Sequence, residues 1–358
     1  MASSLIRRIS LSAARRGGVY GLLRRVNQGP TVLFYHGIEE KLSDPEVQSL
    51  HLPLASFERH IRYLRRHREI ISTDYLYDCL MNGHRLDPRQ VVLTFDDGYK
   101  NNAEILAPFL KGWDLPFTVF ISTRHVLEGR RFQVYLLRTA FLYTEHKVIH
   151  LASIQRSFEA GTPQAKRSAL REASAAMKEA PLRIVEWMMS ECRQLLRPER
   201  WAELDQRFAS DEPMNWQDVI RIQSMGATIG SHCHDHCILH SEEPPPEVRS
   251  QVMDSKRVIE QQFGECKFLA YPNGTARDIS ATAYQSVREA RYRMCFTTIE
   301  GEITAKSDLY YAPRVFAQPG FEEFCYMLNR TGTQNESYDM ACRSFQSGNA
   351  VSAAANRI

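Results

Sequence analysis

The amino-acid sequence predicts an α/β protein built on parallel strands. Short runs of apolar and β-branched residues, typical of buried strands, alternate with segments whose apolar residues recur at helical spacing. Alternation at this distance along the chain implies βαβ units and therefore a parallel sheet. The length of 358 residues fits one α/β barrel with insertions, and it also fits two smaller domains.

The predicted elements follow one another along the chain. Strands, recognised by runs of apolar and β-branched residues, are expected at 31–36, 70–72, 91–95, 117–122, 227–230, 267–271, 293–298 and 309–316. Helices, recognised by an apolar face such as Phe57, Ile61 and Leu64, are expected at 57–67, 102–110, 216–225, 247–263 and 281–291. Pro108 should bend or shorten the second of these helices.

Residues 125–212 interrupt the alternation of strands and helices. Residues 156–179 are rich in Ala, Arg, Lys and Glu, and 181–208 carry apolar residues at helical spacing. The segment contains no cluster of chemically suggestive residues. We therefore expect a helical insertion of about residues 125–212 within one domain of residues 29–330.

The two ends of the chain differ from this domain in composition. Residues 1–28 contain six arginines and no acidic residue, with apolar residues between the arginine pairs. Such a basic amphipathic segment suits the surface of an anionic membrane, and the alternative is an N-terminus with only transient helix. Residues 331–358 are polar and rich in small residues, so we expect them to be disordered.

Composition excludes several classes of function. A net charge of +3, with no basic run interleaved with aromatics, argues against nucleic-acid binding. The sequence has neither the apolar core of a secretory signal nor the roughly 18 apolar residues of a membrane span. The eight cysteines form no C-x-x-C pair, which is typical of free thiols in a reducing compartment. We expect a cytoplasmic protein that can touch the inner face of the membrane through its N-terminus.

The most informative stretch is VVLTFDDGY at 91–99, where a predicted strand ends in Asp96 and Asp97. Active sites of α/β proteins lie at the C-terminal ends of strands. Adjacent carboxylates resist joint ionisation unless a cation or a proton lies between them. A metal ion would remove this conflict.

His232 and His236 could supply further ligands for such an ion. They follow a predicted strand, and on the first turn of a helix residues four apart share one face. Two imidazoles and one carboxylate leave open positions for water and substrate, as in hydrolytic zinc sites. A zinc site that includes Cys233 and Cys237 is an alternative, but it leaves the Asp-Asp pair unexplained.

Three motifs together carry a specific resemblance. TFDDGY at 94–99, GSHCHDH at 230–236 and AYPNG at 270–274 resemble the motifs of the polysaccharide deacetylases, the NodB-homology or carbohydrate esterase family 4 proteins. The resemblance covers about residues 30–320 without the insertion. It implies a distorted (β/α)7-type barrel with the helical insertion. It also implies one divalent metal, with Zn2+ expected first and Co2+, Ni2+ or Fe2+ suited to the same ligand types.

The resemblance also implies a role for each matching residue. Asp96 would be the catalytic base, and the metal ligands would be Asp97, His232 and His236. A backbone N–H near Asn273 would hold the developing oxyanion. The substrate loop would consist of Tyr271, Pro272, Asn273 and Gly274.

The sequence departs from the family pattern at two positions. Ala270 stands where the family usually has an arginine that orients the catalytic aspartate. Arg314 is a candidate substitute, and the alternative is a structural salt bridge. No histidine follows His240, although the family places its general acid in a late L-x-x-H motif. His36, in LFYH, satisfies that motif at the first strand. This arrangement resembles that of some family members, including the poly-N-acetylglucosamine deacetylases, which have a Tyr-His pair upstream of the Asp-Asp pair. We assign His36 as the acid; the alternative is a histidine bonded to the backbone.

The function implied is metal-dependent removal of N-acetyl groups from a polysaccharide or a lipid-linked glycan. One alternative is a deformylase or another linear or cyclic amide hydrolase acting on an aminosugar. A second alternative, from a different class, is a carbohydrate-binding member without catalysis.

Overall fold

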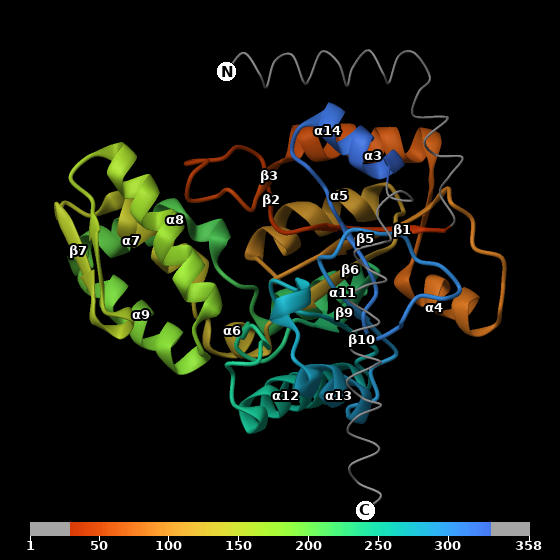
Figure 1. Ribbon diagram of the computed structural model, residues 1–358. Coiled ribbons are helices and arrows are strands. Elements are labelled where there is room, and N and C mark those ends of the chain that lie inside the picture. Colours follow the sequence, from red (N-terminus) through yellow and green to blue (C-terminus); the bar gives the residue numbers. More distant parts are fainter. Residues whose placement is uncertain (1–28, 331–358) are drawn as a thin grey trace, which may run out of the picture.

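The computed structural model describes residues 29–330, and Figure 1 shows their arrangement. The predicted basic segment and the predicted tail lie outside the described residues. Within residues 29–330, no helix combines the length and the apolar character that crossing a bilayer requires.

A parallel eight-stranded sheet forms the centre of the molecule. Its hydrogen-bonded order is β11-β10-β9-β6-β5-β1-β12, and β4 pairs with β5 beside this path. The strands are β1 (Thr31–Tyr35), β4 (Glu69–Ile71), β5 (Gln90–Phe95), β6 (Phe117–Ile121), β9 (Ala227–Ser231), β10 (Phe268–Ala270), β11 (Met294–Phe296) and β12 (Val315–Phe316). Each lies within or close to a range predicted from apolar runs.

The curved sheet is closed by the segment 309–316, which bridges its two edges. Cys295 N donates to Leu309 O over 2.7 Å, and Thr297 N donates to Ala312 O over 2.8 Å. A few residues later, β12 pairs with β1, with Leu33 opposite Val315. Only 315–316 is regular strand, shorter than predicted, because Pro313 offers no N–H to a ladder. The predicted distorted barrel is therefore confirmed.

Helices cover the outside of the sheet. They are α3 (Leu54–His67), α5 (Ala107–Gly112), α11 (Trp216–Ser224), α12 (Pro245–Phe263), α13 (Ala281–Glu289) and α14 (Phe321–Arg330). The helix α4 (Thr73–Met81) instead packs on the opposite side, where its Leu76 joins the cluster inside the curved sheet. Alternate strand residues face opposite sides. Leu33, Leu93 and Val119 pack with the helices, whereas Val32, Val92 and Phe120 belong to a separate cluster on the other side of the sheet. The helix predicted at 102–110 begins as a π-helix at Asn102–Leu106, and α5 follows with Pro108 in its first turn.

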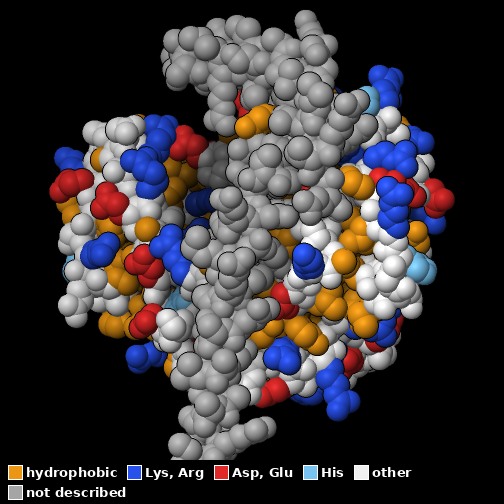
Figure 2. Space-filling view, turned by 45° about the vertical axis from the view of Figure 1, so that its right-hand side comes forward, with side chains coloured by type: hydrophobic (Ala, Val, Ile, Leu, Met, Phe, Trp, Pro, Cys, Tyr) orange, Lys and Arg blue, Asp and Glu red, His pale blue; other side chains and the backbone are white. Residues whose placement is uncertain are grey.

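The insertion forms its own lobe with its own apolar core, beside the barrel in Figure 1. It contains α7 (Gln133–Tyr143), α8 (Pro163–Glu179), α9 (Leu182–Gln194) and α10 (Pro198–Arg207). The preceding helix, α6 (Thr123–Glu128), packs against the barrel instead, with Val126 in the barrel core. The prediction of helix alone was wrong, because β7 (Val148–Leu151) and β8 (Arg156–Glu159) pair as an antiparallel hairpin. Ile149, Leu151 and Phe158 are buried and their neighbours exposed, a period of two that marks strands. The visible surface of the lobe mixes acidic and basic side chains (Figure 2).

Candidate metal and active site

The predicted catalytic and ligand side chains converge at one edge of the sheet. Asp96 and Asp97 follow β5, His232 follows β9, and His36 follows β1. The C-terminal ends of parallel strands meet at one edge of the barrel, which brings these positions together. With His236 and Asn273 they line one cavity of about 370 Å³.

Asp97, His232 and His236 form a compact trio. Asp97 Oδ1 lies 3.3 Å from His232 Nε2 and 3.1 Å from His236 Nε2. Asp97 and His232 are buried, and His236 is partly exposed at the cavity. Zinc binds nitrogen and oxygen ligands tetrahedrally at about 2.0–2.2 Å, so two such ligands are about 3.3 Å apart. The spacing of the trio matches a shared ion.

The hydrogen bonding of His232 also fits a cation at this position. Its Nδ1 lies 2.7 Å from Ala270 O, and a carbonyl only accepts, so Nδ1 carries the proton. In the neutral ring, the Nε2 lone pair then faces a carboxylate oxygen of Asp97. Two electron-rich atoms in contact need a proton or a metal between them. Burial alone would raise the pKa of Asp97, but His236 and His232 hold it well below its usual value.

The two histidines are held by a loop, so their predicted placement on a helical turn was wrong. Residues 232–240 form no helix, and α12 begins only at Pro245. Cys233 and His236 adopt positive φ values of 63° and 55°, which turn the loop back toward the cavity. Phe132, at the start of the insertion, packs its ring edge-to-face against His236 at 5.7 Å. Loop conformation and this contact therefore replace the expected helical spacing.

The alternative zinc site with Cys233 and Cys237 finds no support in the described residues. Both side chains belong to the apolar core between sheet and helices. Burial raises the pKa of both thiols, which disfavours the thiolate that zinc requires. Neither cysteine belongs to a described group of side chains close enough to share an ion.

Asp96 is clamped by Arg314, which is fully buried. Arg314 Nη1 donates to Asp96 Oδ1 over 2.7 Å, and Nη2 donates to Oδ2 over 2.8 Å. Arg314 also donates to Thr297 O and to the Thr94 hydroxyl, so its own position is fixed. Burial would raise the pKa of Asp96, but Arg314 and then His232 hold it below its usual value. The clamp keeps Asp96 ionised and oriented.

His36 lies in the same cavity, and no hydrogen bond ties its ring to the backbone in the described structure. Its Nδ1 is buried without a partner, and the ring packs edge-on to Phe34 at 6.1 Å. The backbone-bonded alternative therefore does not describe its side chain. Burial lowers the pKa of His36, against the opposing pull of Asp97 and Asp96.

The loop at 271–274 places only part of the predicted set at the cavity. Asn273 lines it, with φ 58°, and its Nδ2 donates to Asp278 Oδ2 over 2.6 Å. Gly274 is required by a close approach, because a Cβ there would lie 2.9 Å from Tyr271 O. Tyr271 is fully buried in the core and donates its hydroxyl to Tyr310 O, so its side chain does not reach the cavity. Pro272 does not line the cavity either.

A second buried trio, which the sequence did not reveal, lies outside this cavity. His51 Nδ1 lies 3.6 Å from Glu39 Oε1 and 3.4 Å from Asp211 Oδ1. Asn101 donates to Glu39, and Gln48 donates to Asp211. The ligand atoms of the trio lie within 4.8 Å of one another, close enough to share one ion. Asp211 is far from Glu39 and His51 in the chain, and the three match no motif, so no sequence signal could have found the trio.

The family model for polysaccharide deacetylase matches residues 83–295, more than half of the chain. The deacetylase PplD of Streptococcus pyogenes, solved in complex with acetate, superimposes with a TM-score of 0.54 at 16% identity, over 83% of this chain and 96% of that one.

IcaB from Ammonifex degensii gives a TM-score of 0.54 at 15% identity, over 85% and 98% of the two chains. At these identities the structural likeness shows the fold. A comparison with curated protein sequences returned no match. The match over residues 83–295 shows that the chain belongs to the polysaccharide deacetylase family.

Proposed function

We propose that this protein is a metal-dependent hydrolase that removes N-acetyl groups from a glycan or a lipid-linked glycan. One observation carries the proposal. A single cavity gathers the trio of Asp97, His232 and His236, an arginine-clamped Asp96 and a partly buried His36. These are the ligands, the base and the acid that amide hydrolysis needs.

The trio would hold one divalent cation, with Zn2+ first among the ions that suit its ligands and Co2+, Ni2+ or Fe2+ as alternatives. When bound, such an ion polarises the amide carbonyl and lowers the pKa of a coordinated water to about 7. Asp97 is held without a proton, as a ligand must be.

The proton transfers fall to Asp96 and His36. Asp96, ionised beside Arg314, accepts the proton of the attacking water. His36 donates a proton to the nitrogen that leaves as an amine when the carbon–nitrogen bond breaks. Asn273 lines the cavity, and no acceptor is recorded for its backbone N–H among the described residues, so this N–H is available to the oxyanion.

The test is release of acetate and free amine from N-acetylated chito-oligosaccharides by the metal-loaded protein. We expect turnover in wild type and its loss in Asp96→Asn, with metal content unchanged. N-formylated and ureido substrates, run in parallel, distinguish the deformylase and other amide hydrolases. Glycan binding without turnover of any amide would contradict the proposal and favour a non-catalytic carbohydrate-binding protein.

We further propose that the protein works in the cytoplasm, at the inner face of the membrane, on a precursor of an exported glycan. The support is the basic composition of residues 1–28. Fractionation of a fluorescent fusion should show less membrane-bound protein once residues 1–28 are removed. Equal partitioning of the two forms would contradict this location.

A further inference from the structure

One wall of the candidate active-site cavity is aliphatic, and the insertion contributes much of it. Val134 comes from α7, Met177 from α8, and Leu182 and Val185 from α9; Leu50 and Ile238 add to the same lining. The trio of Asp97, His232 and His236 and the proposed acid and base line the same cavity. The cavity therefore combines a polar reacting end with an apolar wall.

A glycan chain alone fits this lining poorly. Sugar hydroxyls need hydrogen-bond partners when they leave water, and Val, Leu, Ile and Met side chains offer none. An apolar chain, by contrast, gains free energy when it covers the same side chains. The wall therefore favours a substrate with an apolar part close to the amide that is cleaved.

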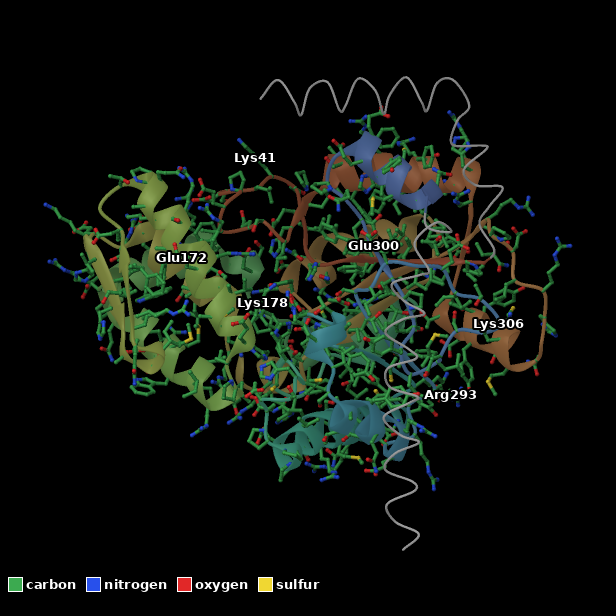
Figure 3. All side chains as sticks on the ribbon, in the orientation of Figure 1. Lys41, Glu172, Lys178, Arg293, Glu300 and Lys306 are labelled. Atoms are coloured by element: carbon green, nitrogen blue, oxygen red, sulfur yellow. The ribbon has the colours of Figure 1, made fainter. Side chains whose placement is uncertain are left out.

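Two cationic side chains line the same cavity without an acidic partner. No ion pair is recorded for Arg138 or Lys178 among the described residues, and Arg138 makes one hydrogen bond, to Val47 O at 3.2 Å. Figure 3 labels Lys178 at the side of the insertion that faces the barrel. Burial is the largest cause of a lowered pKa at Lys178. Asp278 opposes this effect, and Arg138 and Arg277 add to it. The carboxylates of the same cavity are engaged elsewhere, Asp96 by Arg314 and Asp97 by His232 and His236. Arg138 and Lys178 are therefore left for an anion.

We propose that the substrate is an N-acylated aminosugar whose phosphate carries an apolar chain. Arg138 and Lys178 bind the phosphate, and the chain lies along the wall of Val134, Met177, Leu182 and Val185. The proposal rests on the proposed hydrolase function. Water adds to the amide carbonyl and the carbon–nitrogen bond breaks, giving a carboxylate and an amine. The phosphate and its apolar chain stay attached to the sugar and are not altered by the reaction.

Three substrates test the two parts of this inference separately. They are tri-N-acetylchitotriose, N-acetylglucosamine 1-phosphate and the farnesyl ester of that phosphate. We expect kcat/KM for amine release to rise at least tenfold from the first to the second, and again from the second to the third. The gain in kcat/KM on adding the phosphate measures the contribution of Arg138 and Lys178. The gain on adding the farnesyl chain measures the contribution of the aliphatic wall.

Two variants assign these preferences to residues. Lys178→Gln should reduce the preference for the phosphate substrate over chitotriose at least tenfold. Val185→Asn should reduce the preference for the farnesyl ester over the free phosphate by a similar factor. Lys147→Gln, an exposed lysine of the insertion that does not line the cavity, is the control and should change neither ratio.

The outcomes separate this inference from the proposed function. Turnover of chitotriose at least as fast as of both phosphates, with no effect of Lys178→Gln, would overturn the inference and leave the hydrolase standing. No amine from any substrate would overturn the proposed function itself. Preferred turnover of N-octanoylglucosamine would place the apolar chain on the acyl side and also overturn the inference.

Discussion

Asp96 depends on a partner that is distant in sequence. Arg314 reaches it from the segment that closes the barrel and makes both of its contacts through one guanidinium. This chain has Ala270 at the usual arginine position of the family pattern, so another arginine must orient Asp96. The sequence identified Arg314 as a candidate for orienting Asp96, because Arg314 lies near the end of a predicted late strand. It could not show the paired geometry, which depends on closure of the barrel.

Arg314→Lys should lower kcat by roughly 10–100-fold, because a lysine keeps the charge but cannot hold both oxygens of Asp96. KM and metal content should change little, since Arg314 is fully buried and does not line the cavity. Steady-state kinetics with metal analysis measures this, and Arg293→Lys at an exposed site is the matched control. An unchanged kcat would show that the pair serves only structure.

His36→Gln should lower amide hydrolysis by about 10²–10⁴-fold, because the leaving nitrogen needs a proton. An activated aryl acetate needs no such proton, since its leaving group is already stable as an anion. The variant should therefore lose far less activity on 4-nitrophenyl acetate than on an N-acetyl sugar. Equal losses on the two substrates would contradict the role of His36 as the acid.

At the scale of elements, strands and outer helices were largely predictable, and the loops that shape the site were not. Apolar runs fixed β1, β5, β6 and β9 to within one or two residues of the expected ranges. The loop that carries His232 and His236 has no such signal, because cysteine and histidine are not residues that mark positive φ values in a sequence. The hairpin of β7 and β8 was not predicted because each strand has only four residues. An alternation of apolar and polar residues over so short a stretch is a weak signal beside the longer helical segments around it.

The packing of α14 on α3 should make stability depend on pH through His60. Its ring stacks on Phe324 at 3.8 Å, and burial, with a smaller effect from Arg59, lowers its pKa from 6.5 to about 3. A histidine whose pKa is lower in the folded state makes its full contribution to stability at pH values above its pKa in the unfolded state. The unfolded state takes up the proton first as pH falls, so this contribution is lost between pH 6.5 and about 3.

Chemical denaturation across this range should show the free energy of unfolding falling by up to about 1.4 kcal/mol per pH unit from this group. His60→Phe keeps the stacking but cannot titrate, so its pH dependence should be shallower than that of wild type. Parallel curves for the two proteins would contradict the assignment.

At the scale of the whole molecule, two of the contact regions between the barrel and the insertion gather polar side chains. One is the cavity, where the insertion supplies much of the aliphatic wall. The other is the buried trio that joins Asp211 to Glu39 and His51 near the first strands. Sequence predicted the insertion but assigned it no chemistry, because its contribution to the site is made by ordinary aliphatic side chains. Only the folded arrangement shows that these side chains face the proposed catalytic residues.

The most direct test of the metal-dependent hydrolase is metal content, measured by plasma mass spectrometry on protein purified without chelators. Wild type should carry a single divalent ion, His236→Ala should carry none, and His51→Ala, at the second trio, should keep it. Wild type that stays metal-free after zinc is added would contradict the account. Metal retained in His236→Ala but lost in His51→Ala would contradict it equally, because the ion would then lie away from Asp96 and His36.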